Sequence, residues 1–186
     1  MGLITNIFKK KEELPPFDVS SLYVDVHSHF IPGIDDGAQT IEDSLRLISE
    51  FAEKGYKKVI TTPHIMSDYY KNTPEIILSG LDKVREALSK EGIKIEIEAA
   101  AEYNLEPGFE EIIKSGKVLT FGGDKKYVLF ELSFFNEPSR IKEVIWDLLN
   151  LGYQPVLAHV ERYAYWHKKW DKIEDIPANY LINLLS

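Results

Sequence analysis

Histidines and acids that come directly after short apolar runs are the residues of this sequence best suited to chemistry. The first pair, His27 and His29, follows the apolar run Leu22-Tyr23-Val24. Side chains two residues apart on a strand point to the same side, so we expect both imidazoles to bind one metal ion together. The next loop is rich in glycine and carries Asp35 and Asp36. Either aspartate can fold back over such an ion, and the spacing leaves the choice between them open.

The same combination of an apolar run and a polar residue recurs along the chain. The later residues of this kind are His64, Glu102, Glu131 and His159. In parallel α/β folds the carboxyl ends of the strands converge on one rim, so we expect these side chains to meet. Imidazole and carboxylate bind zinc, manganese and non-haem iron, and this many ligands exceeds the needs of one ion. The sequence therefore predicts a cluster of two or three divalent ions, which polarises phosphoryl oxygens and activates water.

Other residues near these positions are suited to binding a substrate. Arg162 follows His159 by three residues and is expected to hold a phosphate through two parallel hydrogen bonds, with an ion pair to Glu161 as the alternative. His167 lies among aromatic and basic residues and is expected to be structural or to form a wall facing the substrate. The aromatic residues available to line a pocket for a phenyl group are Tyr69, Tyr70, Phe134, Phe135, Tyr163 and Trp166.

Strand and helix patterns alternate along the chain, which predicts a parallel sheet with crossover helices. Strands are expected over residues 22–27, 57–62, 93–101, 127–132 and 154–158. Helices are expected between Thr40 and Gly55 and over residues 74–90, 107–115 and 139–151. The last apolar run, residues 180–185, is either a sixth strand or the end of a helix that begins near Asp171. Residues 1–20 are charged and contain Pro15-Pro16, so we expect an N-terminal arm followed by one domain over residues 21–186.

Composition excludes several classes of function. The chain has 186 residues, a net charge of −8 and no cysteine. The acidic balance argues against nucleic acid as a partner, and the lack of cysteine excludes disulfides, thiolate nucleophiles and cysteine-bound metals. No apolar run approaches the roughly 18 residues that a membrane span needs, and no secretory signal is evident. The cytoplasm is therefore the expected location.

The segments that carry these residues resemble the polymerase-and-histidinol-phosphatase (PHP) superfamily. Within it they are most similar to the bacterial tyrosine-protein phosphatases of capsule and exopolysaccharide operons. The matching segments are residues 25–29 with 32–38, 61–64, 100–103, 129–132 and 155–163. The loop pattern His-x-His-x-x-Pro-Gly-Ile-Asp-Asp-Gly, at residues 27–37, is typical of this phosphatase subgroup.

The resemblance implies an α/β fold, a distorted TIM-like barrel of seven βα units. It implies up to three divalent ions, most often manganese, with iron, zinc or magnesium as alternatives. The implied activity is hydrolysis of phosphotyrosine by metal-activated water, on the tail of a bacterial tyrosine autokinase. The resemblance assigns metal ligation to His27, His29, Asp36, His64, Glu102, Glu131 and His159. It assigns the phosphate to Arg162, and we expect Arg162 and Asp36 to act directly in catalysis.

The sequence also departs from this family. Its members carry a later strand that ends in Asp-x-His, and no Asp-x-His follows His159 here. We therefore expect a barrel without its last βα unit and without two metal ligands, whose open strand edge favours self-association. Two alternatives to the tyrosine phosphatase are a histidinol-phosphate-type phosphomonoesterase and an inactive binding or regulatory module.

Overall fold

The structure is a computed structural model that describes residues 22–167 and 182–183. Every strand pair within these residues is parallel, as the alternation of strands and helices predicts. The arm predicted over residues 1–20 lies outside the described residues, and so does the helix alternative that begins near Asp171. None of the described helices is long and apolar enough to cross a membrane.

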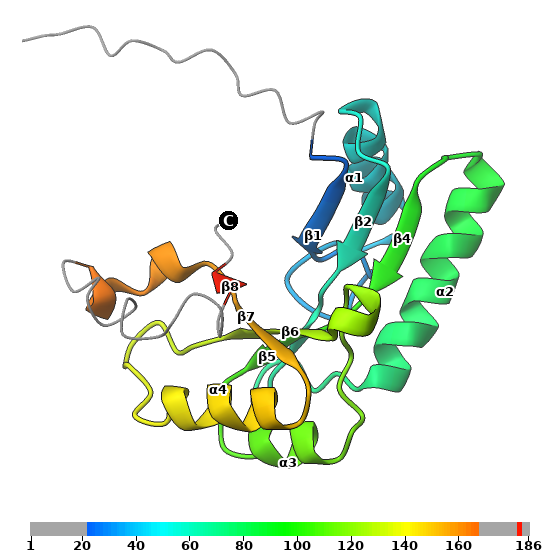
Figure 1. Ribbon diagram of the computed structural model, residues 1–186. Helices are drawn as coiled ribbons and strands as arrows, with labels where there is room; N and C mark the ends of the chain where they lie inside the picture. Colours follow the sequence, from blue (N-terminus) through cyan, green and yellow to red (C-terminus); the bar gives the residue numbers. More distant parts are fainter. Residues whose placement is uncertain (1–21, 168–181, 184–186) are drawn as a thin grey trace, which may run out of the picture.

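The strands form two parallel sheets (Figure 1). The first sheet has the order β1-β2-β4, with bounds Val24–Ser28, Lys58–Thr61 and Glu96–Ala99. The second has the order β3-β5-β6-β7-β8, with bounds His64–Ile65, Glu102–Asn104, Tyr127–Glu131, Gln154–Leu157 and Ile182–Asn183. The last of these strands confirms the strand alternative for the final apolar run.

Two of the predicted strands are each followed at once by a short second strand that belongs to the other sheet. The chain leaves β2 at Thr62-Pro63 and enters β3, and it leaves β4 at Ala100-Ala101 and enters β5. Proline has no N–H to donate to a ladder, so the first break falls at Pro63. The neighbouring strand bends at the same level, and His64 then pairs with Glu102 in the second sheet. Glu102 therefore begins a strand, whereas the sequence predicted that it follows the end of one.

The predicted helices are confirmed as α1 (Ile41–Glu53), α2 (Pro74–Glu91), α3 (Phe109–Lys114) and α4 (Ile141–Asn150). Thr40 caps α1 in a reciprocal capping box with Asp43. Thr73 caps α2, which ends at Gly92 with a φ of 70°, a left-handed conformation that glycine adopts without steric cost. In Figure 1, α1 and α2 flank the first sheet, while α3 and α4 lie along the second. Three short 3₁₀ segments, Gly123–Lys125, Val160–Arg162 and Ala164–Trp166, complete the elements.

Two apolar clusters hold these layers together. The larger one joins both sheets to the helices and includes Ile48, Val84, Phe130 and Leu148. The smaller one consists of Ile60, Ala100, Phe121, Leu129, Val156 and Ala158. Burial of this apolar surface supplies the main favourable free energy of folding and fixes the strand ends relative to one another.

The described strands do not close into a ring. Within residues 22–167 and 182–183, β1 pairs only with β2, and β8 pairs only with β7. The α/β class with parallel strands is therefore as predicted, but the described part of the chain forms two joined sheets with free edges. Closure into a seven-unit barrel stays a prediction.

Candidate metal centre

The eight residues singled out from the sequence line a single cavity of about 310 Å³. They are His27, His29, Asp36, His64, Glu102, Glu131, His159 and Arg162. Gly37 and Phe134 complete its lining. Its lining residues come from the ends of strands or from the loops that follow them, as expected for parallel sheets.

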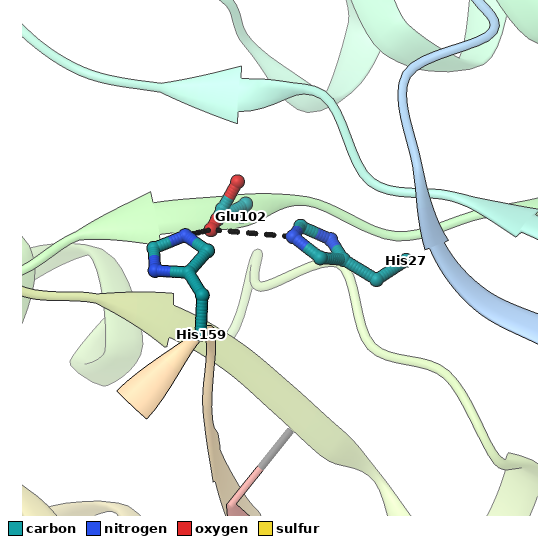
Figure 2. Close-up of side chains that lie close together, drawn as sticks. All are labelled: His27, Glu102 and His159. Atoms are coloured by element: carbon teal, nitrogen blue, oxygen red, sulfur yellow. Dashed lines mark hydrogen bonds and ion pairs between the residues drawn. The ribbon is translucent and has the colours of Figure 1, made fainter. Parts of the chain in front are cut away.

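Glu102 is the centre of the cluster and is only 1% exposed. One carboxylate oxygen, Oε1, lies 2.9 Å from His159 Nε2 and 3.6 Å from His27 Nε2. The other, Oε2, lies 3.1 Å from His64 Nδ1 and 3.5 Å from His29 Nε2. Figure 2 shows His27 and His159 approaching this carboxylate from opposite sides. Four imidazoles therefore share one buried carboxylate.

Hydrogen bonds at the far side of two rings orient the first pair of imidazoles. Thr62 Oγ1 lies 2.7 Å from His27 Nδ1, and Asp35 Oδ2 lies 2.7 Å from His29 Nδ1. With Nδ1 donating in each case, Nε2 is the ring atom that faces Glu102 and can bind a metal ion once it has lost its proton. Sequence reasoning missed Thr62, whose position at a strand end was the only signal available.

The two neighbouring aspartates have different surroundings. The Asp35 side chain is fully buried, and it also accepts hydrogen bonds from the backbone N–H groups of Gly37 (3.0 Å) and His64 (3.1 Å). The Asp36 side chain is 65% exposed, with Oδ1 3.5 Å from His64 Nε2 and 3.9 Å from His29 Nδ1. Asp35 is therefore engaged in orienting the site, while Asp36 keeps a carboxylate at the cavity wall.

Gly37 allows the loop to return close to the first strand. A Cβ atom at this position would collide with the Cβ and the carbonyl oxygen of His29. The backbone hydrogen bond from Ala38 N to His29 O, at 3.0 Å, marks the same close approach. The glycine is thus needed for packing space beside a candidate ligand.

His159 enters the cavity because the backbone turns at this residue. Val156 and Ala158 belong to the smaller apolar cluster, whereas Leu157 belongs to the larger one. Regular alternation of side chains along the strand would place His159 on the same side of the sheet as Leu157. Its backbone instead adopts a left-handed conformation with a φ of 34°, which is unfavourable for a residue with a Cβ. This turn directs the imidazole toward Glu102.

Burial and hydrogen bonding shift the proton equilibria of the cluster in opposite directions. Burial lowers the pKa of His27 to about 4, although Glu102 opposes this shift. Burial also acts to lower the pKa of His29, but the hydrogen bond to Asp35 and the nearby Glu102 carboxylate outweigh it and raise the pKa to about 10. For Glu102, burial acts to raise the pKa, yet the hydrogen bond with His159 and the nearby His29 imidazole hold it below its usual range. The cluster therefore contains an ionised buried carboxylate that attracts cations.

Several buried polar atoms of the cluster lack hydrogen-bond partners within the described part of the chain, as expected of atoms that bind a metal ion. Glu102 Oε2, His64 Nδ1 and His159 Nδ1 are buried and have no hydrogen-bond partner among the described residues. His64 Nδ1 and Glu102 Oε2 are 3.1 Å apart, but not in hydrogen-bonding geometry. Groups of potential ligand atoms within 4.8 Å of one another are His27-Glu102-His159, His29-His64-Glu102 and His29-Asp35-Asp36. These imidazole and carboxylate donors suit zinc, manganese or iron.

Arg162 and Phe134 form the remaining wall of the cavity. The Arg162 guanidinium carbon lies 5.3 Å from the centre of the Phe134 ring. Of the other aromatic residues predicted to line a pocket, Tyr163 and Trp166 are buried, and Tyr69 and Phe135 are largely exposed. Tyr70 stacks on the back of His64 instead, with ring centroids 5.2 Å apart, and His167 is exposed with Nε2 2.8 Å from the Glu161 carbonyl oxygen.

The fold and this cluster define an α/β protein with a candidate centre for several divalent ions. Comparison with known proteins identifies the family. The family described as "Capsular polysaccharide synthesis, CpsB/CapC" matches residues 23–182. The chain therefore belongs to the CpsB/CapC family, as the resemblance of its motifs indicated.

Individual relatives agree with this assignment. Tyrosine-protein phosphatase YwqE of Bacillus subtilis is 32% identical over 139 residues, which cover 75% of this chain and 54% of the relative. Tyrosine-protein phosphatase CpsB of Streptococcus agalactiae is 28% identical over 153 residues, which cover 82% of this chain and 63% of the relative. The chain thus spans just over half to under two thirds of the length of these relatives.

A solved structure also has this fold. The matching chain belongs to a study of the crystal structures of YwqE from Bacillus subtilis and CpsB from Streptococcus pneumoniae. Both proteins are described there as unique metal-dependent tyrosine phosphatases. The similarity has a TM-score of 0.72 at 30% identity and covers 78% of this chain and 58% of the other. The parallel α/β architecture is therefore shared with these proteins.

Proposed function

We propose that the protein is a metal-dependent protein-tyrosine phosphatase of the PHP type, with residues 21–186 as its metallophosphatase domain. The observation that carries this proposal is the meeting of four imidazoles, three carboxylates and one guanidinium in one cavity of about 310 Å³. The relatives named as tyrosine-protein phosphatases support the same activity.

The residues of the cavity can be assigned to separate metal positions. His27, Glu102 and His159 would hold one divalent ion, and His29 and His64 would hold a second with Glu102 between them. Asp36 and Glu131 are the further carboxylates proposed as ligands. Bound divalent ions would supply Lewis acidity and an activated water for attack on phosphorus.

Arg162 is proposed to bind the phosphoryl oxygens. Its guanidinium can form two parallel hydrogen bonds, which both orients the phosphate and offsets its charge. A phosphotyrosine ester leaves as a phenolate, which departs more readily than an alkoxide because phenol is the stronger acid. The site therefore needs less assistance from a proton donor than an alkyl phosphatase does.

Finer features of the proposal follow the family resemblance. They are manganese as the preferred ion, with iron, zinc or magnesium as alternatives, up to three ions, and a tyrosine autokinase tail as the substrate in the cytoplasm. Closure of the sheets into a distorted (β/α)7 barrel belongs to the same proposal. The free edges of β1 and β8 among the described residues are where a closing strand or a second copy of the chain would pair.

Hydrolysis of a phosphotyrosine peptide, with and without added manganese, tests the activity. We expect turnover that depends on metal, that a chelator removes, and that falls by at least about a hundredfold in His27→Ala and His159→Ala. Turnover that survives both substitutions, or that resists the chelator, would contradict the proposal. Folding of each variant is checked by circular dichroism, so that loss of activity is not loss of structure.

The same preparation separates the alternatives. Faster turnover of histidinol phosphate than of the phosphotyrosine peptide would favour the small phosphomonoesterase. Elemental analysis that finds no ion, or only one, together with no turnover, would favour the binding or regulatory module. Light scattering after size exclusion tests self-association, because pairing of the free edges predicts a dimer or a larger species.

A further inference from the structure

We propose that Phe134 is the residue that selects aromatic over alkyl phosphate esters, by contacting the phenyl ring of the substrate. This inference rests on the proposed phosphatase function. Apart from the imidazoles, Phe134 provides the only ring in the lining of the cavity, as far as the described residues go. The rest of the lining consists of imidazoles, carboxylates, the Arg162 guanidinium and Gly37, and none of these offers the face of an apolar ring.

The position of Phe134 relative to the phosphate-binding group supports this role. Its ring lies 5.3 Å from the Arg162 guanidinium carbon, and its centroid lies 5.5 Å from that of His159. A phosphoryl group held between Arg162 and the metal cluster would carry its ester substituent to the level of this ring. A phenyl substituent then gains a ring-to-ring contact, whereas a methyl or hydroxyalkyl substituent does not.

The Phe134 ring is held in place by a stack of aromatic residues behind it. It stacks on Tyr163 with centroids 5.7 Å apart, and Tyr163 stacks on Tyr165 at the same separation. The Tyr163 hydroxyl donates to the Ala158 carbonyl and accepts from the Leu132 N–H, both at 3.0 Å. Anchoring of this kind lowers the entropy cost of presenting the ring to a ligand.

Exposure distinguishes Phe134 from the aromatic residues around it. It is 41% exposed, so part of the ring is open to a ligand, whereas Tyr163 is fully buried. Phe135, the next residue, is 90% exposed but does not line the cavity. Phe135 is therefore a matched control, because it is the same residue type in the same loop.

Binding of two phosphonates to the manganese-loaded full chain tests the proposal without turnover. Phenylphosphonate and methylphosphonate carry the same anionic group, and only the first has a ring. Isothermal titration calorimetry would measure both affinities in the wild type, Phe134→Ala, Phe134→Trp and Phe135→Ala. We expect the wild type to prefer phenylphosphonate by about threefold to tenfold, the effect of one aromatic contact.

The ratio of the two affinities identifies the role of the ring. In Phe134→Ala we expect the preference to disappear while methylphosphonate binds within about twofold of the wild type. Phe134→Trp and Phe135→Ala should keep the preference. An unchanged ratio in Phe134→Ala would overturn the proposal, because Phe134 would then act only by supporting Arg162 or His159.

Two further outcomes keep the failure of this inference separate from failure of the proposed function. Binding of both phosphonates by the wild type with equal affinity would overturn the role of Phe134 and leave the phosphate site intact. Binding of neither, with manganese present, would overturn the phosphatase proposal and the role of Phe134 together. Arg162→Ala is the reference variant for loss of the phosphate site, and it should weaken both ligands alike.

Discussion

Replacing Asp35 tests whether a buried carboxylate that is not assigned as a ligand controls metal binding. The Asp35 side chain accepts from three donors: His29 Nδ1 at 2.7 Å, the Gly37 N–H at 3.0 Å and the His64 N–H at 3.1 Å. An asparagine has one acceptor oxygen and one NH₂ donor, so it cannot satisfy donors on both sides. The best orientation keeps the oxygen toward His29 and His64 and places the NH₂ against the Gly37 N–H.

The size of the effect follows from these contacts. A hydrogen bond to a charged group contributes about 1.5–3 kcal/mol and a neutral one about 1 kcal/mol, so Asp35→Asn weakens the restraint on His29 without removing it. Loss of a carboxylate that supports a metal-binding histidine lowers metal affinity by about tenfold to a hundredfold. We therefore expect a loss of about tenfold in Asp35→Asn and of about a hundredfold in Asp35→Ala, which removes all three contacts.

Calorimetric titration of the metal-free full chain with Mn²⁺ measures this loss directly. Thermal unfolding of the same variants shows whether the fold persists. Asp124→Asn, in the exposed turn before β6, is the matched control and should bind manganese like the wild type. If both Asp35 variants bind manganese within about twofold of the wild type while Asp124→Asn does the same, the positioning role of Asp35 is wrong.

Further predictions concern the same cluster. Glu102→Gln should lower manganese affinity by more than about a hundredfold in calorimetry, because two of the three ligand groups contain this carboxylate. Since the pKa of His29 is about 10, its imidazole is protonated at pH 7.5 without metal. Manganese binding should then release about one proton and should weaken as the pH falls. Calorimetry in buffers of different ionisation enthalpy measures the released proton. Binding without proton release would contradict the raised pKa of His29. Burial raises the pKa of Asp25 to about 6, so its charge is unfavourable in the folded state at pH 8. Asp25→Asn should raise the free energy of unfolding by about 3 kcal/mol in urea denaturation at pH 8, and the gain should shrink as the pH falls through 6, where the folded protein takes up the proton. Gly37→Ala should weaken manganese binding in the same titration, because its Cβ would displace His29, and normal binding would show that the loop can relax.

Much of the fold could be predicted because local signals agreed with one another. Thr40, Thr73 and Gly92 mark helix ends by hydrogen bonds and backbone conformations that depend on neighbours in the sequence, so the helix ranges could be predicted from local residues. The second strand that begins at Glu102, just past the strand expected over residues 93–101, could not be predicted, because it follows a bend shared with the neighbouring, paired strand. That pairing joins segments distant in sequence.

The sequence by itself determined which residues could form the candidate site, because their types and their places after apolar runs limit them to metal and phosphate chemistry. Tertiary structure alone decided how they meet. It distinguished buried Asp35 from exposed Asp36, which are equivalent by spacing, and it turned His159 inward against the alternation of its strand. It also selected Phe134 from six aromatic candidates. Each of these outcomes depends on contacts between segments that are far apart in the chain. Composition and local spacing do not determine such contacts.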